Sequence, residues 1–157
     1  MSELIQILDE FWEWTGNSLY WRTKEASRFP FDPLCFPKFD ELRNKCIALI
    51  NTSMSSEEVD AFLVCLALDS EDELILDSCK EFASSLFTSN LLSVGINHMQ
   101  VGARWQIAEL LRKKDIPNKK GYLNRLLKDP HPYVRQRAFN VLCEENGIGD
   151  RSKPLKK

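Results

Sequence analysis

The sequence predicts an all-α fold, a short α-solenoid of about four antiparallel helix pairs within a single domain, residues 1–157. Three observations support this prediction. Apolar residues recur at helical spacing along most of the chain, whereas strand-like alternation is hard to find. Glycine and proline are few, at 6 and 7 residues. A helical pattern also repeats at an offset of 31 residues, from Ala103–Leu111 to Val134–Leu142, as expected when stacked helix pairs bury faces that one pair cannot bury alone.

The first 54 residues are expected to close the N-terminal end of the solenoid. A helix over 2–14 places its apolar residues on one face (Leu4, Ile7, Leu8 and Phe11). Residues 15–37 break this pattern. Their three prolines among three phenylalanines indicate an ordered apolar connection rather than a floppy linker. A second helix is expected over 38–51.

Residues 55–146 carry the repeating helical pattern, and 147–157 form a tail. Ser55 and Glu58 have the S-x-x-E spacing of a capping box, so a helix begins there. The next helix is expected over 73–87, with Phe82 and Leu86 on its inward face. The remaining pattern predicts a shorter helix within 88–98 and helices over about 100–113, 118–128 and 132–145.

The last repeat contains a motif that resembles a known family. It reads L-x-D-x-x-x-x-V-R-x-x-A-x-x-x-L, carried by Leu127, Asp129, Val134, Arg135, Ala138 and Leu142. This pattern is similar to the second helix of HEAT-like repeats. In the unit before it Arg104 aligns with Arg135, but Ala103 replaces the valine and no aspartate stands at the turn position. The resemblance covers roughly 55–146 and implies that Asp129 and Arg135 bond between units, a structural role.

Several function classes have no support in the sequence. No nucleotide-binding, hydrolase or metalloprotease motif is present, so we expect no enzyme, cofactor or metal site. The five cysteines are scattered without a C-x-x-C pair, which favours a reducing compartment. The N-terminus does not resemble a signal peptide, and no run of eighteen apolar residues could span a membrane. We therefore expect a cytoplasmic protein.

Charge is divided unevenly along the chain. Residues 1–100 contain 7 Lys+Arg and 17 Asp+Glu, whereas 101–157 contain 14 and 6, although the net charge is only −2. The acidic candidates for partner binding are Glu57, Glu58, Asp60, Asp69, Glu71, Asp72, Glu73 and Asp77. Two explanations are open. The acids are a solvated helix face with N-terminal dipole partners, or they complement a basic partner protein.

The basic and aromatic residues allow similar alternatives. The basic residues of the last two repeats either are solvated and bonded between units or form a phosphate-binding surface. They are Arg104, Arg112, Lys113, Lys114, Lys119, Lys120, Arg125, Lys128, Arg135 and Arg137. The N-terminal tryptophans Trp12, Trp14 and Trp21 either fill the core and cap or anchor a partner.

These features lead to three functional hypotheses. The first is a non-catalytic immunity protein of a bacterial toxin–immunity pair, as in contact-dependent growth inhibition, because the catalytically bare acidic domain resembles helical immunity proteins. It would occlude the active site of a basic toxin, in particular a nuclease, as a monomer or in a one-to-one complex, without membrane or direct nucleic-acid binding. The second is a HEAT-like nucleic-acid-binding or DNA-repair protein. The third is a scaffold or adaptor subunit.

Overall fold

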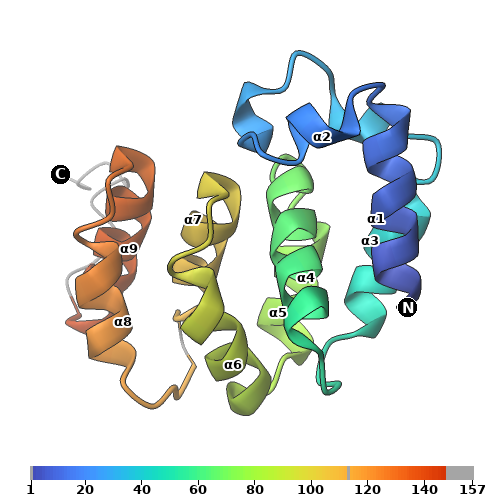
Figure 1. The fold of residues 1–157 in the computed structure, drawn as a ribbon. Coiled ribbons are helices and arrows are strands. Elements are labelled where there is room, and N and C mark those ends of the chain that lie inside the picture. Colours follow the sequence, from blue (N-terminus) through green and yellow to red (C-terminus); the bar gives the residue numbers. More distant parts are fainter. Residues whose placement is uncertain (1, 113, 148–157) are drawn as a thin grey trace, which may run out of the picture.

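The computed structural model describes residues 2–112 and 114–147. Within these ranges every regular element is helical, which confirms the predicted all-α class (Figure 1). The α-helices are α1 (Glu3–Trp14), α2 (Ser18–Trp21), α3 (Phe39–Ala48), α4 (Ser56–Leu68), α5 (Leu74–Phe82), α6 (Ser85–Gly95), α7 (Val101–Leu110), α8 (Lys119–Leu126) and α9 (Pro132–Glu145). Two short 3-10 helices, η1 (Ala26–Arg28) and η2 (Pro33–Cys35), lie between α2 and α3.

The longer helices stand side by side in a row that runs from α1 at one end to α8 and α9 at the other (Figure 1). α1 packs against α3 and α4, α4 packs against α7, and α7 packs against α9. Ion pairs hold α1 against the antiparallel α3, between Glu10 and Lys38 and between Glu3 and Lys45 (both 2.5 Å). α4 and α7 therefore lie in the middle of the molecule.

Their central position explains the composition of α4 and α7. Seven of the last eight residues of α4 are buried, and nearly all of α7 is buried. The two helices approach closely where Gly102 faces Ala67. A Cβ atom added at Gly102 would lie 3.0 Å from the Ala67 Cα, so no larger residue fits without displacing α4. The helix start predicted at Ser55 is confirmed, because the Ser55 hydroxyl accepts from the Glu58 N–H (3.2 Å) and Glu58 accepts from the Ser55 N–H (2.9 Å).

The prediction of one helix over 73–87 is wrong, because the chain breaks into α5 and α6 at Ala83. Ala83 is extended, and the Ser84 side chain caps α6 by accepting from the Phe87 N–H (3.1 Å). The Asn51 side chain also holds this break, since it donates to the Phe82 carbonyl (2.8 Å) and accepts from the Ser84 N–H (2.7 Å). As a consequence, Phe82 and Leu86 are exposed rather than inward.

The connection between α1 and α3 is ordered, as predicted. Trp21 packs edge-on against Phe29 and Phe31, with ring centroids 5.5 and 5.4 Å apart. The Gln100 side chain joins this segment to the start of α7, because it accepts from the Ala26 N–H and donates to the Lys24 carbonyl (both 2.8 Å). The connection therefore covers parts of α4 and α7 as well as the N-terminal end.

Candidate functional site

The candidate site is a groove of about 470 Å³ between α1 and α4, which we call the α1–α4 groove. Its walls are apolar and its rim carries charged side chains. The lining residues are Ile5, Leu8, Asp9 and Trp12 of α1, Arg22 after α2, and Ser56, Glu57, Asp60, Ala61 and Val64 of α4. Hydrophobic grooves between helices are one of the recurring forms in which proteins bind a segment of a partner.

Regular helix geometry produces this groove. On α1 the lining residues follow the spacing i, i+3, i+4 and i+7 from Ile5 to Trp12, and on α4 the same spacing runs from Glu57 to Val64. Residues at this spacing share one helix face. The two helices run parallel, because α3 is antiparallel to α1 and the short turn over 49–55 returns the chain into α4. Two matching faces thus border the groove along about two turns.

The rim of the groove is mainly acidic. Glu57 is exposed and forms no ion pair with any residue in the described ranges. Asp60, with 67% of its side chain exposed, lies 3.0 Å from His98 Nε2, and this hydrogen bond lowers the pKa of the Asp60 carboxyl. Asp9 forms an ion pair with Arg22 (2.7 Å), which is the basic side chain among the lining residues. A basic segment of a partner would therefore be attracted to the rim near Glu57 and Asp60.

The predicted acidic residues do not form one face. Glu57, Glu58 and Asp60 lie in the first turns of α4, whereas Glu71, Asp72 and Glu73 lie beyond its other end, in the turn before α5. Asp69 lies twelve residues after Glu57, a distance of about 18 Å at the helical rise of about 1.5 Å per residue. Asp77 projects from α5 and lies 3.8 Å from Lys80. Only Glu57 and Asp60 of the eight line the α1–α4 groove.

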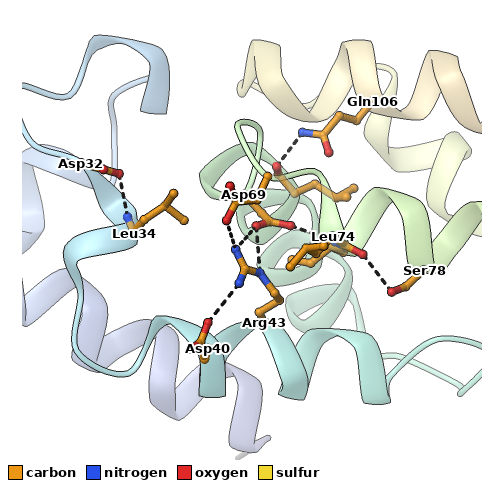
Figure 2. Close-up of polar contacts among 11 residues, drawn as sticks. Asp32, Leu34, Asp40, Arg43, Asp69, Leu74, Ser78 and Gln106 are labelled. Atoms are coloured by element: carbon orange, nitrogen blue, oxygen red, sulfur yellow. Dashed lines mark hydrogen bonds and ion pairs between the residues drawn. The ribbon is translucent and has the colours of Figure 1, made fainter.

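The prediction that Asp69 binds a partner is wrong, because its exposed fraction is 0% and no part of it is accessible to another protein. Arg43 of α3 donates to the Asp69 carboxylate through Nε (3.0 Å) and Nη2 (2.6 Å), and the Ile75 N–H donates to its second oxygen (2.9 Å). Figure 2 shows the Arg43 guanidinium pointing toward Asp69 and Asp40. Arg43 also binds Asp72 (2.9 Å). Asp69 therefore joins α3, α4 and α5.

The predicted aromatic anchors lie in three different environments. Trp12 is buried, as the core-and-cap alternative expects, and its ring forms part of the groove wall. Trp21 is half-buried against Phe29 and Phe31. Trp14, 38% exposed, is the tryptophan with the most surface among these three, and it packs beside Phe11 and Phe36. These contacts explain the aromatic composition of the N-terminal region by packing.

The 31-residue repeat is visible in the hydrogen bonds. Arg104 donates to the carbonyls of His98 (2.8 Å) and Met99 (3.2 Å), and Arg135 donates to the equivalent carbonyls of Asp129 (2.7 Å) and Pro130 (3.0 Å). Arg104 also forms a buried ion pair with Asp129 of the following unit (2.8 Å).

His98 occupies the position that the motif assigns to aspartate. The His98 ring accepts from the N–H two residues later (3.1 Å), as the Asp129 carboxylate does (2.9 Å). Because a histidine stands there in place of an aspartate, the equivalence cannot be recognised from the sequence motif. Val134 and Ala138 of the motif are fully buried, and Leu142 is half-buried.

Most basic side chains of the last two repeats are bonded to acceptors of the same chain. Glu109 of α7 is buried and receives Arg112 (3.0 Å) and Arg137 (3.0 Å), and Arg112 also pairs with Glu144. Further contacts are those of Lys114 with the Cys79 and Ala83 carbonyls, Lys119 with Glu145, and Arg125 with Asn97. Lys120 and Lys128 are exposed, and Lys113 lies outside the described residues.

The chemistry-bearing residues elsewhere are buried or dispersed. Burial raises the pKa of the Cys79 thiol to about 12, and burial also raises that of Cys46 well above its usual value, so neither is a ready nucleophile. In the described ranges no three His, Cys, Asp or Glu side chains are grouped so that they could hold a metal ion. No helix in that part of the chain has the length and apolar character needed to cross a membrane.

Asp9, Arg22 and Val64 line the groove but carry no sequence pattern that marks them as site residues. The sequence of α1 nevertheless indicates a wider apolar surface, because Ile5 and Trp12 lie beside the apolar row of Leu4, Ile7, Leu8 and Phe11. Comparisons with protein-family models, with curated proteins and with solved structures give no match for this chain.

Proposed function

We propose that this protein is a non-catalytic binding module that takes a basic segment of a partner protein into the α1–α4 groove. The observation that carries the proposal is the combination of apolar walls with the exposed carboxylates Glu57 and Asp60 at one rim. Apolar walls supply affinity, and opposite charge steers the encounter and selects the partner.

In its most specific form, the proposal is an immunity-type inhibitor acting in the cytoplasm. The protein would bind a cognate basic toxin, in particular a nuclease, in a one-to-one complex and cover the surface with which the toxin binds phosphate. We place this function on a short HEAT-like solenoid. The repeated arginine contacts of Arg104 and Arg135 support that architecture, because such contacts recur when similar units stack.

The nucleic-acid alternative has less support from the geometry. Three arginines on which that hypothesis depends form ion pairs with carboxylates of the same chain. They are Arg104, Arg112 and Arg137. Phosphate binding needs cationic groups that are free to replace counterions. The scaffold alternative differs from our proposal only in the identity of the partner, and it would use the same groove.

The test compares two charge reversals of equal size. The immobilised protein is exposed to a lysate of its source organism as wild type, as Glu57→Lys and as Glu71→Lys, and the retained proteins are quantified by mass spectrometry and assayed for nuclease activity. We expect a basic protein that wild type and Glu71→Lys retain in equal amounts, that Glu57→Lys loses, and whose nuclease activity the wild type suppresses. Equal retention by all three baits would refute the groove as the binding site.

A further inference from the structure

We infer that the segment bound in the α1–α4 groove is an amphipathic α-helix of two to three turns, with basic residues beside its apolar stripe. This inference rests on the proposed function, because it names the kind of partner segment that the groove takes. The observation behind it is the matched spacing of the two walls, where Ile5–Trp12 and Glu57–Val64 each present i, i+3, i+4 and i+7.

The dimensions of the groove fit one ridge of helix side chains. From Ile5 to Trp12 the wall is about 10 Å long at the helical rise of 1.5 Å, which is two turns. The groove of about 470 Å³ lies between two neighbouring helices, and such a groove takes a row of side chains from a helix packed across it. A third helix would therefore lie on α1 and α4 and insert a row of side chains between them, as helices pack by ridges into grooves.

The charges define where the basic residues of that helix lie. Glu57 and Asp60 are three residues apart on α4, so their carboxylates stand about one turn apart along the rim. Two lysines or arginines at i and i+3 or i+4 on the partner helix would match them. Elsewhere on the lining, Arg22 pairs with Asp9 (2.7 Å), which disfavours a further basic side chain beside it. The groove thus prefers a helix whose basic residues are concentrated toward the N-terminal end of α4.

An extended peptide is a poorer fit. Peptides that bind as strands need a sheet edge with unpaired backbone groups, and both walls of this groove are helices whose backbone groups bond internally. The groove also lacks the series of aromatic rings that polyproline segments use, since Trp12 is the aromatic residue among its lining side chains. The helix-in-groove mode is the remaining way to use both walls.

The experiment uses a synthetic 18-residue peptide with leucines at i, i+3, i+4 and i+7 and flanking lysines at one end. Its control is a peptide of the same composition rearranged to alternate leucine and lysine. Binding of each labelled peptide is measured by fluorescence anisotropy at physiological salt, and helix formation is followed by circular dichroism. We expect the helical peptide to bind at least about tenfold more tightly than the control peptide, with a gain in helicity.

Two pairs of protein variants locate the binding. Val64→Glu places a charge on the apolar wall, and its matched control Val94→Glu changes an exposed valine of α6. We expect Val64→Glu and Glu57→Lys each to weaken binding of the helical peptide by about tenfold or more, while Val94→Glu and Glu71→Lys change it less than about twofold. Thermal unfolding of each variant establishes that it folds, and Glu57→Lys, at an exposed position, preserves the test if Val64→Glu does not fold.

Each contrary outcome has a distinct meaning. Equal binding of both peptides, or binding that survives Val64→Glu and Glu57→Lys, would overturn the helix inference. If the natural partner depends on Glu57 but the helical peptide does not compete with it, the inference fails and the proposed function stands. Self-association that Val64→Glu abolishes, seen by light scattering without peptide binding, would assign the groove to a second copy of this chain and also overturn the inference.

Discussion

Replacement of Asp69 by asparagine tests whether the Arg43–Asp69 pair holds α3, α4 and α5 together. Asp69 is fully buried and accepts three hydrogen bonds, two from Arg43 and one from the Ile75 N–H. Asp69→Asn keeps the shape of the side chain but leaves the buried guanidinium without its main counter-charge. Removing one partner of a buried pair costs about 3–5 kcal/mol. Arg43 retains Asp40 (3.1 Å) and Asp72 (2.9 Å), so we expect a loss near the lower limit, about 3 kcal/mol.

The matched control is Asp72→Asn, which removes a different carboxylate from the same arginine. The Asp72 side chain is 49% exposed, so water can replace it and the loss should stay below about 1 kcal/mol. Urea denaturation followed by circular dichroism measures both losses at pH 7. Losses of equal size, or a loss below about 1 kcal/mol for Asp69→Asn, would refute the assignment of Asp69 as a structural residue.

Four further predictions concern other parts of the molecule. Gly102→Val should lower the free energy of unfolding by about 2 kcal/mol, measured by urea denaturation, because its side chain collides with Ala67. Ser55→Ala should cost about 1 kcal/mol in the same assay, because α4 loses its cap. The hydrogen bond from the Ser55 N–H lowers the pKa of the Glu58 carboxyl below its usual 4.5. The stability that this hydrogen bond contributes is therefore present above pH 4.5 and is lost as the pH falls through the lowered pKa. Glu58→Gln should flatten the curve of unfolding free energy against pH below pH 4.5. Duplex DNA should bind no more tightly than about 10⁻⁴ M at physiological salt, and Lys120→Glu should not change the fluorescence anisotropy; tight, salt-dependent binding would favour the nucleic-acid alternative.

Features that depend on local sequence could be predicted. The start of α4 follows from the Ser55–Glu58 spacing, because both partners of the capping box lie in one helical turn. The resemblance implies a bond between units for both Asp129 and Arg135. Asp129 makes such a bond, to Arg104 of the preceding unit, whereas Arg135 donates to carbonyls five and six residues upstream in its own unit. The all-α class follows from helical spacing repeated along most of the chain.

Features that depend on distant residues could not be predicted in the same way. The break at Ala83 is held by Asn51, and nothing near Ala83 in the sequence indicates that contact. Asp69 is an acidic residue like Glu71 and Asp72, which are exposed, and its burial depends on Arg43, 26 residues earlier. The groove itself requires α1 and α4 to be adjacent, which the periodicity of each helix alone does not determine.

The most direct test of the central claim is the dissociation constant of the isolated partner for wild type, Glu57→Lys and Glu71→Lys, measured by surface plasmon resonance over a range of salt concentrations. The two variants change the net charge equally, but only Glu57 lines the α1–α4 groove. We predict that Glu57→Lys weakens binding by about tenfold or more and reduces its salt dependence, while Glu71→Lys leaves the dissociation constant within about twofold of wild type. Equal effects of the two reversals, or a larger effect of Glu71→Lys, would contradict the claim that the partner binds in this groove.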